Sequence, residues 1–495
     1  MFTKIFPASV IKEIDRLTIE KQGITSDRLM ERAVDALLAE LQPYLSKEHK
    51  IMIFSGVGNN GGDGLVLARK LLLSGYHVEP VIVAFSEKKS PDFEINFQRL
   101  IQTGVRPSFF GRGFSGKANL VVDAVFGVGL NRPAGGLAAE AIHYINKISA
   151  EGATVFSVDM PSGLYADRLN APEDPVVKAG RVFTFQFPKY SFFFEENRFF
   201  VPEFTLVDIG LDKGVIEVQN TFDFYVTDAP VSLVRSDVFA SKAAYGHVAI
   251  LGGVEGKSGA VILASLAALR AGAGWVTAYV PESTAQVIRA MRSEIMTSIV
   301  EGESVYVKDF RLFDRRKYLA VGPGLGTHYL TAVAMKKLLQ PYFKPVVLDA
   351  DALNILAKNP DLFSYIPPDS ILTPHEGELR RLAGSWSNTM EKWEVASQLA
   401  QKNNVIIVAK GRYTLITDGS RRFFNSTGNP ALAKAGTGDV LTGVLTAMLA
   451  RGIKPLEAAV AGVYYHGKAA DCWIEKHGNY SLLPTDLIDC LSMVE

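Results

Sequence analysis

The chain carries the stretch NPALAKAGTGD at residues 429–439, and the apolar run VLTGVL follows at once at residues 440–445. Gly436 and Gly438 allow the backbone to turn tightly with its N–H groups pointing one way. The apolar run predicts a buried helix, so these N–H groups would lie at a helix N-terminus, which favours an anion. Asp439 would repel a phosphate there, unless its carboxylate takes a proton from a hydroxyl group that attacks the phosphate. The alternative is an acidic residue in the first turn of a helix, with no chemical role.

The rest of the second half repeats one pattern, in which a short apolar strand ends in a polar or glycine-rich turn. Strands predicted to begin at residues 247, 318, 345, 371 and 405 run into turns at residues 252–253, 322–326, 349–354, 373–378 and 410–414. Ligands of open α/β sheets bind at the carboxyl ends of the strands, so these turns can converge on one crevice. Lys410 beside Gly411 suits a phosphate. His375 taken alone is more typical of a structural residue.

The first half of the chain predicts a second α/β unit. A strand at residues 50–55 runs into GVGNNGGDG at residues 56–64, and a helix at residues 65–73 and a strand at residues 78–84 follow. This order of strand, glycine loop, helix and strand implies parallel strands that are joined by a right-handed crossover. Five glycines close together allow a bulky ligand to approach the backbone closely.

Polar side chains gather near three predicted strand ends of this first unit. Asn60 follows the first strand, Asp123 lies in a strand at residues 120–126, and Asp159 and Ser162 follow a strand at residues 154–158. Such an oxygen-rich cluster could hold a hard cation such as K⁺ or Mg²⁺. The alternative is that the two aspartates only cap the helices that follow them.

Composition sets the broad class. The chain has 495 residues, of which 48% are hydrophobic and 21% charged, which is typical of an ordinary globular protein with two or three domains. The formal net charge of 0 favours neither nucleic acid nor an anionic membrane as a partner. The periodicity fades near residue 212, so we predict domains at residues 1–212 and 236–495 with a linker at residues 213–235.

We expect a cytoplasmic protein. The two cysteines form no CxxC pair and suit a reducing compartment. Lys12, Glu13, Asp15 and Arg16 stand where a signal peptide would need an apolar core. The longest apolar stretch, at residues 260–269, is too short to span a bilayer.

Two sets of motifs resemble known families. The second half resembles the ribokinase-like superfamily, and more closely the ADP-dependent NAD(P)H-hydrate dehydratases, through GPGLG (322–326), LDADALN (348–354), TPHEGE (373–378) and the stretch at residues 429–439. The first half resembles the NAD(P)H-hydrate epimerase domain through GNNGGDG (58–64), Asp123 with GVGLNRP (127–133), and DMPSG (159–163). The fused order is that of the bifunctional NAD(P)H-hydrate repair family. The resemblance implies an α/β chain of two doubly wound domains, a Rossmann-like three-layer αβα domain followed by a ribokinase-like domain.

For the second domain the resemblance implies a lyase that repairs hydrated NADH and NADPH (NADHX and NADPHX). Asp439 would deprotonate the C6 hydroxyl group of the S hydrate, which would attack the terminal phosphate of ADP; elimination of phosphate would then restore NAD(P)H, and Mg²⁺ would screen the phosphates. The implied nucleotide-binding residues are Lys410, Gly411, Arg412, Tyr413, Thr414, Asn429, Pro430, Ala431, Leu432, Ala433, Lys434, Ala435, Gly436, Thr437 and Gly438. The implied hydrate-binding residues are Gly324, His375, Glu376, Gly377, Glu378, Leu379, Arg380, Arg381 and Asp439.

For the first domain the resemblance implies an isomerase that interconverts the R and S hydrates. The implied hydrate-binding residues are Asn59, Asn60, Gly61, Gly62, Asp63, Gly127, Val128, Gly129, Leu130, Asn131, Arg132, Pro133 and Asp159. Asn60, Asp123 and Ser162 would coordinate K⁺. An acid–base group is needed near C6, and either Asp123 or Asp159 could supply it. The partners are therefore NADHX, NADPHX and ADP, with no nucleic acid and no membrane, and we also expect a homo-oligomer.

Two other functions fit part of the pattern. A small-molecule kinase would need the GTGD stretch and the glycine turns but would not need a second nucleotide-type domain. A non-catalytic dinucleotide-binding scaffold would not need Asn60, Asp123 and Asp159 together. Phosphorylated alcohol as a product would favour the kinase, and hydrate binding without epimerisation would favour the scaffold.

Overall fold

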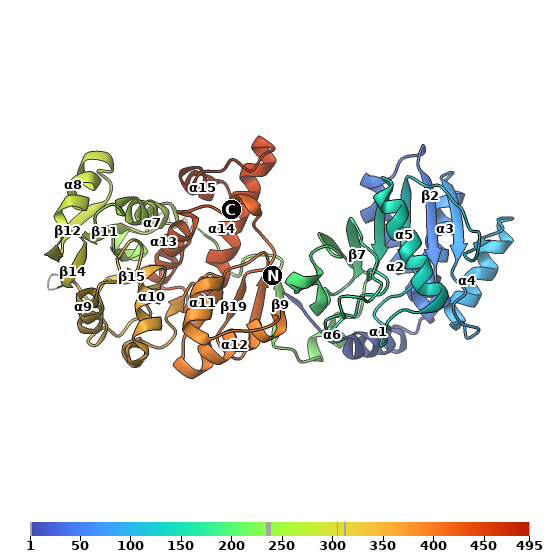
Figure 1. Cartoon of the computed structure of the whole chain (residues 1–495), viewed down its shortest axis with the longest axis horizontal. Helices are drawn as coiled ribbons and strands as arrows, with labels where there is room; N and C mark the ends of the chain where they lie inside the picture. Colours follow the sequence, from blue (N-terminus) through green and yellow to red (C-terminus); the bar gives the residue numbers. More distant parts are fainter. Residues whose placement is uncertain (1, 234–238, 304, 311–312, 495) are drawn as a thin grey trace. The chain divides into compact units, whose positions relative to one another are not determined.

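The structure is a computed structural model that describes residues 2–233, 239–303, 305–310 and 313–494. The chain forms two compact units (Figure 1). One is Lys4–Thr221, and the other is Phe222–Glu495 together with Met1–Thr3. The predicted linker at residues 213–235 contains a helix, α6 (Lys213–Val218), and a strand, β9 (Asp223–Val226). The predicted start of the second domain at residue 236 lies outside the described residues.

The N-terminal unit is built on a seven-stranded sheet with the strand order β4-β3-β2-β5-β6-β7-β8. All of its pairings are parallel. The chain moves from β2 to β4 in one direction and from β5 to β8 in the other, so the switch point lies between β2 and β5, where α/β sheets bind ligands. The strands are β2 (Lys50–Ser55), β3 (His77–Ile82), β4 (Ser108–Phe109), β5 (Leu120–Ala124), β6 (Thr154–Val158), β7 (Arg181–Phe185) and β8 (Phe204–Val207).

Helices cover both faces of this sheet, because its strands are apolar on both sides. In β2, Ile51 and Ile53 join the core beneath α1, α2, α3 and α4, whereas Met52 and Phe54 join the core beneath α5. The helices are α1 (Ala8–Gln22), α2 (Ser26–Leu41), α3 (Asn59–Leu73), α4 (Pro91–Gln102) and α5 (Gly136–Ala150). The result is the three-layer αβα architecture that the family resemblance implies.

The C-terminal unit is built on an eleven-stranded sheet with the strand order β1-β9-β20-β19-β18-β17-β16-β15-β10-β11-β12. In the order of the sheet, the strands between β18 and β12 are all parallel to their neighbours. Strand β19 runs antiparallel to both of its neighbours. The bounds are β1 (Phe2–Lys4), β10 (His247–Leu251), β11 (Trp275–Val280), β12 (Met296–Ile299), β15 (Tyr318–Val321), β16 (Val347–Leu348), β17 (Ile371–Leu372), β18 (Ile406–Ala409), β19 (Leu415–Thr417) and β20 (Arg422–Asn425). A separate antiparallel pair is formed by β13 (Glu301–Glu303) and β14 (Tyr306–Asp309).

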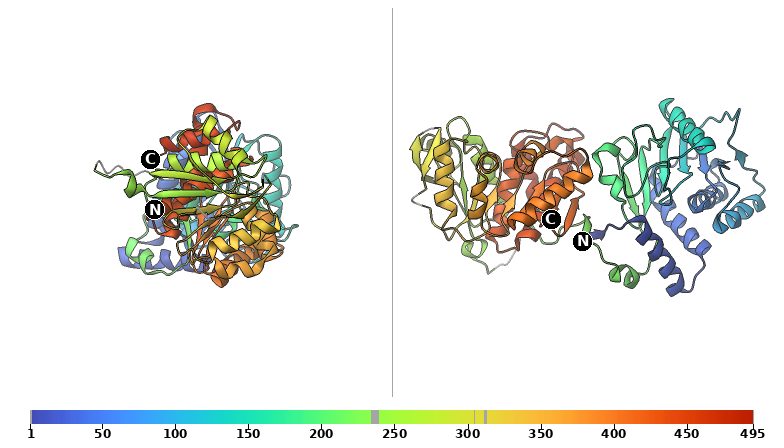
Figure 2. Two further views of the ribbon diagram at one scale, coloured as in Figure 1. Left: turned by 90° about the vertical axis from the view of Figure 1, so that its left-hand side faces the viewer. Right: turned by 60° about the horizontal axis from the view of Figure 1, so that its bottom comes forward.

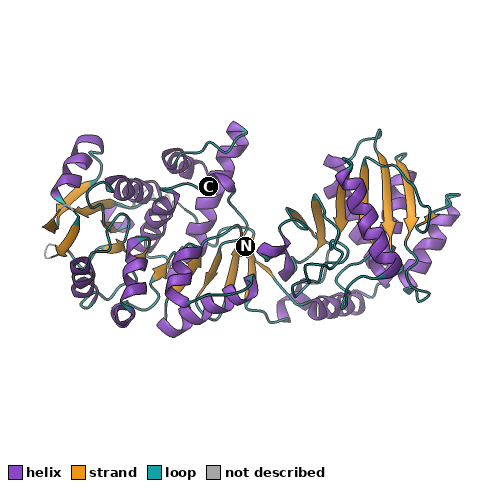
Figure 3. Cartoon of the chain, in the orientation of Figure 1, coloured by secondary structure: helices purple, strands orange, loops and turns teal. Residues whose placement is uncertain are grey.

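The helices of this unit also lie on both faces of its sheet (Figures 2 and 3). They are α7 (Ser258–Arg270), α8 (Glu282–Met291), α9 (Tyr329–Leu339), α10 (Asp351–Lys358), α11 (Glu376–Ala383), α12 (Thr389–Asn403), α13 (Thr437–Ala450), α14 (Pro455–His477) and α15 (Pro484–Cys490). Helix α13 is buried from Val440 to Ala450. It packs tightly on α7, because a Cβ atom at Gly443 would lie 2.0 Å from the carbonyl oxygen of Ala264. In the described part of the chain, no helix is both long and apolar enough to cross a bilayer.

Candidate active sites

The GNNGGDG motif of the N-terminal unit forms the start of helix α3, which begins at Asn59, whereas the sequence predicts a loop over these residues. Its glycines bring the helix against the strand ends. A Cβ atom at Gly61 would lie 1.8 Å from the carbonyl oxygen of Gly56, and one at Gly64 would lie 2.8 Å from the Cβ of Ala124. The motif therefore fixes a close helix–strand packing and places Asn59 and Asn60 in the first turn.

A cavity of about 680 Å³ lies at the switch point of this sheet. Predicted residues that line it are Asn59, Asn60, Asp63, Gly127, Val128, Gly129, Leu130, Asn131, Arg132, Pro133 and Asp159. Gly61 and Gly62, also predicted to bind the hydrate, lie in the packed part of α3 and are buried. Other lining residues include Lys12 and Asp15 of helix α1 and Phe85.

Among the described residues, only one of the two polar atoms of the Asn60 side chain has a hydrogen-bond partner. Its Nδ2 donates to the carbonyl oxygen of Val158 at 3.1 Å. Its Oδ1 is buried and accepts no hydrogen bond from the described residues. Such an unpaired carbonyl oxygen is the kind of ligand that a hard cation takes, so Asn60 fits a K⁺ ion.

Asp123 lies behind the cavity wall rather than in it. It is fully buried, and its carboxylate accepts hydrogen bonds from the Ser157 hydroxyl at 2.8 Å and from the Ser162 backbone N–H at 2.8 Å. The Ser162 hydroxyl also donates to it. Burial raises the pKa of Asp123, although the hydrogen bonds from Ser162 oppose this shift. Asp123 thus ties β5 to the turn after β6.

Asp159 reaches the cavity from the end of β6 and carries a charged partner. Its backbone is left-handed, with φ of +64°, and its Oδ1 lies 2.6 Å from the Nζ of Lys189. Lys189 is 1% exposed and also donates to the hydroxyl of Thr184 at 2.6 Å. Sequence reasoning missed Lys189, because nothing in the sequence near it shows that it meets Asp159.

Two further carboxyl groups share this cavity with Asp159. Burial, together with the neighbouring Asp159 charge, raises the pKa of Asp15 to about 7. Burial and the same Asp159 charge raise the pKa of Asp63 well above its usual value. Lys12 and Asp15 were missed as site residues, although their spacing of three residues in an amphipathic helix could have placed them on one face.

The GTGD stretch of the C-terminal unit lies at the start of α13. Gly436 is left-handed with φ of +98°, and a Cβ atom there would lie 2.8 Å from a methyl carbon of Leu263. Asp439 is in the first turn of the helix. A Cβ atom at Gly438 would lie 3.6 Å from the Nζ of Lys410 and 3.7 Å from Oδ2 of Asp349. The start of α13, the ammonium group of Lys410 and the buried carboxylate of Asp349 therefore lie close together.

The charges at this point act on Asp439. Lys410 forms an ion pair with Asp349, and the Thr442 hydroxyl donates to Asp349 at 2.8 Å. Burial, and then the charge of Asp349, raise the pKa of Asp439 to about 7, although Lys410 opposes the shift. A carboxyl group in this range can take up and release a proton at neutral pH.

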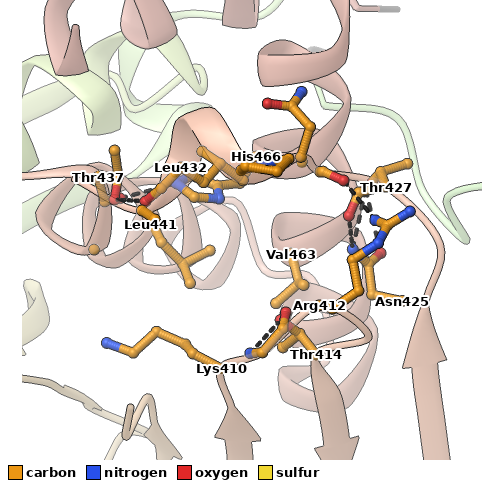
Figure 4. Close-up of a pocket in the computed structure, with 17 residues that line it drawn as sticks. Lys410, Arg412, Thr414, Asn425, Thr427, Leu432, Thr437, Leu441, Val463 and His466 are labelled. Atoms are coloured by element: carbon orange, nitrogen blue, oxygen red, sulfur yellow. Dashed lines mark hydrogen bonds between the residues drawn. The ribbon is translucent and has the colours of Figure 1, made fainter. Parts of the chain in front are cut away.

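A cavity of about 410 Å³ opens beside the start of α13. Figure 4 shows Lys410 and Thr414 on one side and Leu432 and Thr437 on another. Predicted nucleotide-binding residues that line it are Lys410, Gly411, Arg412, Thr414, Asn429, Pro430, Leu432, Ala433, Thr437 and Gly438. Their chain neighbours Tyr413, Ala431, Lys434, Ala435 and Gly436 do not line it.

His466 of α14 also lines this cavity and was not predicted. One ring nitrogen, Nε2, lies 2.8 Å from the carbonyl oxygen of Thr437, so Nε2 carries a hydrogen and donates. Burial lowers the pKa of His466 to about 4, so the ring is neutral near pH 7. It supports the first turn of α13 without adding charge.

The predicted hydrate-binding segment after β17 forms the start of α11. The Nδ1 of His375 accepts hydrogen bonds from the backbone N–H groups of Gly377 at 3.0 Å and Glu378 at 3.3 Å. The Glu378 carboxylate accepts in return from the backbone N–H of His375 at 2.9 Å. His375 is thus a helix cap, the structural role that a lone histidine suggests. Burial raises the pKa of Glu378, against the opposing charge of Lys410.

The remaining predicted residues of this segment are held by local contacts. Leu379 is buried, Arg380 pairs with Glu376, and Arg381 donates to Asn354 at 3.0 Å. Gly324 has φ of +60°, and a Cβ atom there would lie 2.7 Å from the Cβ of Lys257. Among the described residues, no three His, Cys, Asp or Glu side chains form a preassembled metal cluster.

Comparisons with known proteins agree with this division into two units. A family model described as NAD(P)H-hydrate dehydratase matches residues 248–492, and one described as YjeF-related protein N-terminus matches residues 26–191. The bifunctional NAD(P)H-hydrate repair enzyme of Moorella thermoacetica is 34% identical over 98% of this chain and 96% of its own length. The enzyme of the same name from Coxiella burnetii is 32% identical over 99% of each chain.

One solved structure is similar to about half of this chain. It is the ADP/ATP-dependent NAD(P)H-hydrate dehydratase of Bacillus subtilis, co-crystallised with ATP and Mg²⁺, which is 32% identical over 52% of this chain and 92% of its own, with a TM-score of 0.45. The full-length similarity to the Moorella and Coxiella enzymes, together with the two family matches, shows that this chain belongs to the family of bifunctional NAD(P)H-hydrate repair enzymes, which join an epimerase and a dehydratase.

Proposed function

We propose that the C-terminal unit dehydrates the S hydrate of NADH or NADPH by phosphorylating its C6 hydroxyl group from ADP and then eliminating phosphate. The observation that carries this proposal is the position of Asp439, in the first turn of α13 and directly after Gly438, which lines the cavity. Its pKa, raised to about 7 by burial and by Asp349, suits a group that accepts a proton near neutral pH.

The reaction would proceed in two steps. The Asp439 carboxylate takes the proton of the C6 hydroxyl group as its oxygen attacks the terminal phosphorus of ADP, and the bond from that phosphorus to AMP breaks. The ring nitrogen lone pair then expels phosphate from C6, and loss of a proton from C5 completes the double bond of the nicotinamide ring. Lys410, which lines the cavity, would bind the phosphate that moves.

The residues proposed to bind ADP and the hydrate are those that the family resemblance implies. Residues 410–414 and 429–438 would hold ADP, and Gly324 and residues 375–381 would face the hydrate. Mg²⁺ would screen the phosphate charges when it is bound with the nucleotide. Asp349 and Glu378, whose charges both interact with Lys410, would be the carboxyl groups that hold such an ion. The proposal of ADP rather than ATP as the phosphate donor rests on the family resemblance.

We propose that the N-terminal unit interconverts the R and S hydrates in its cavity of about 680 Å³. Asp159 is the acid–base candidate that the geometry favours, because it lines the cavity, whereas Asp123 is fully buried behind it. The unpaired Oδ1 of Asn60 would bind K⁺. Asp123 and Ser162 would complete that site, since Asp123 already organises Ser162.

One assay tests both proposals. Purified full-length protein receives mixed R and S hydrates with ADP or ATP, and the absorbance of reduced nicotinamide is followed over time. We expect all of the hydrate to be converted with ADP. Conversion of about half, with R hydrate left, would refute the epimerase proposal. Accumulation of a phosphorylated alcohol without reduced nicotinamide would instead support the small-molecule kinase, which the family membership does not favour.

We also propose a cytoplasmic homo-oligomer. Cys472 and Cys490 are both free thiols, which suits a reducing compartment. Sedimentation equilibrium of the purified protein would test the oligomer, and a monomer at micromolar concentration would refute it.

A further inference from the structure

Helix α1 contributes a wall to the cavity of the N-terminal unit. Lys12 and Asp15 of this helix both line the cavity. The family match to the N-terminal domain begins at residue 26, so the whole of α1 lies before it. The helix is fixed in place by its apolar side, because Ile11 and Ile14 are buried in the core of the unit. Its polar side is therefore held rigidly against the cavity.

Asp15 is half-buried, and the groups that act on it are charges rather than hydrogen-bond donors. In the described part of the chain, these charges are the Asp159 carboxylate and the Lys189 ammonium group. Lys189 forms its ion pair with Asp159, at 2.6 Å. The two carboxyl groups therefore differ. Asp159 has a cation beside it, whereas no described residue forms a hydrogen bond or an ion pair with Asp15, whose oxygens can meet a ligand in the cavity.

We propose that Asp15 is a second catalytic acid–base residue of the epimerase, acting together with Asp159 on the C6 hydroxyl group of the bound hydrate. This inference rests on the proposed epimerase function of the cavity. Epimerisation at C6 needs a proton donor for the oxygen that leaves and a proton acceptor for the oxygen that returns. Asp15 supplies the donor, and Asp159, paired with Lys189, is the acceptor.

The step balances without an added reactant. The lone pair of N1 forms a C6=N1 double bond as the C6–O bond breaks, and the Asp15 proton goes to the leaving oxygen, which departs as water. Water then adds to the other face of C6, the electron pair of the double bond returns to N1, and the Asp159 carboxylate takes the proton that the water loses. Nothing is oxidised or reduced, and exchange with solvent restores the two carboxyl groups.

Asp63 lines the same cavity but is a poorer donor. It is 9% exposed and is surrounded by the negative charges of Asp159, Asp92 and Asp15. Burial raises the pKa of Asp63 well above its usual value, so it gives up a proton less readily than an ordinary carboxyl group does. Burial and the Asp159 charge bring the pKa of Asp15 to about 7, where a group gives and regains a proton readily.

The test uses the full-length protein with K⁺, ADP and Mg²⁺, and the variants Asp15→Asn, Asp15→Glu and Glu13→Gln. Glu13 is the matched control, since it lies on the same helix, is exposed and pairs with Arg16 on the surface. Each protein receives R hydrate alone and S hydrate alone, and reduced nicotinamide is followed. Wild-type protein that fails to convert R hydrate would refute the epimerase function itself, and not only the role of Asp15.

With active wild-type protein, we expect Asp15→Asn to lower kcat for R hydrate by about 100-fold or more, with KM changed by less than about threefold. Conversion of S hydrate stays at the wild-type rate, because it needs only the dehydratase. Asp15→Glu recovers part of the lost rate, and Glu13→Gln behaves as wild type. A rate with Asp15→Asn within about threefold of wild type overturns the proposal, and so does a rise in KM with kcat unchanged.

Two independent measurements guard against a merely structural effect. Calorimetric titration of Asp15→Asn with R hydrate is expected to show binding within about threefold of wild type, and loss of binding would overturn the catalytic role. In water enriched in oxygen-18, wild-type protein should place the label in the C6 hydroxyl group of the epimerised hydrate. Retention of the original oxygen would show that the C6–O bond does not break.

Discussion

Lys410 and Asp349 form an ion pair, with 3.1 Å between Nζ and Oδ1, although they are 61 residues apart in the chain. Asp349 follows β16, Lys410 follows β18, and β17 lies between these strands in the parallel sheet. The hydroxyl of Thr442 in α13 holds the other carboxylate oxygen. The pair thus joins two strand ends to the helix that carries Asp439, and it sets the charge around that residue.

Asp439→Asn is expected to lower nucleotide-dependent dehydration by about 100-fold or more, because the amide cannot take the hydroxyl proton. Interconversion of R and S hydrates should persist, since it occurs in the other unit. The measurement is the recovery of reduced nicotinamide absorbance from S hydrate. Glu457→Gln is the matched control, because Glu457 is an exposed acidic residue in the first turn of α14. Survival of most of the dehydration would remove Asp439 from its role.

The pH dependence of dehydration should report the same residue. The base must be a carboxylate, and burial with the Asp349 charge raises the pKa of Asp439 to about 7. Activity should therefore fall as the pH drops through about 7. Asp349→Asn removes a negative neighbour, so the pKa of Asp439 should fall and the acid limb of kcat should move to lower pH. An unchanged acid limb in this variant would contradict the assignment.

Replacing K⁺ should affect the N-terminal unit. We expect epimerisation to fall by about tenfold or more when K⁺ is exchanged for a bulky organic cation, and Asn60→Ala should lose the K⁺ dependence, because its Oδ1 is the unpaired buried oxygen. The measurement is the conversion of R hydrate with the dehydratase in excess. Equal rates with and without K⁺ would show that the ion is not needed.

Lys189→Met should destabilise the N-terminal unit by about 3 kcal/mol, since it leaves the buried Asp159 charge without its partner. The measurement is urea unfolding followed by a signal from this unit. Lys178→Met is the control, because Lys178 is exposed. If both variants unfold at the same urea concentration, the ion pair contributes nothing to stability. R-hydrate conversion should also fall, because Asp159 loses the cation that holds it.

Local sequence patterns predicted the strands well. The predicted strands at residues 50–55 and 154–158 coincide with β2 and β6, and the strands predicted to begin at residues 247 and 318 begin there as β10 and β15. Short apolar runs bounded by glycine or polar turns carry their information locally, because a strand that is buried on both faces must be apolar throughout. The same patterns did not reveal β9, β19 and β20, which are short and pair at one end of the larger sheet.

The start of α3 shows a second limit. Asn59–Gly64 reads as a loop because glycine disfavours helix. Packing overrides that preference, since a side chain at Gly61 or Gly64 would collide with the strand ends. Tertiary packing also decides the place of the first strand of the chain. Strand β1 joins the sheet of the C-terminal unit, where the Phe2 ring lies 5.1 Å from that of Phe423.

The sequence by itself determined the two α/β units, the order of their glycine and aspartate motifs, and the family. Those features depend on residues that are close together in the chain. Only the tertiary structure decided that Asp159 rather than Asp123 faces the cavity, that Lys189 pairs with Asp159, and that α1 brings Asp15 to the same place. These are contacts between residues far apart in sequence. They depend on how helices and strands pack, and on the burial that follows from this packing.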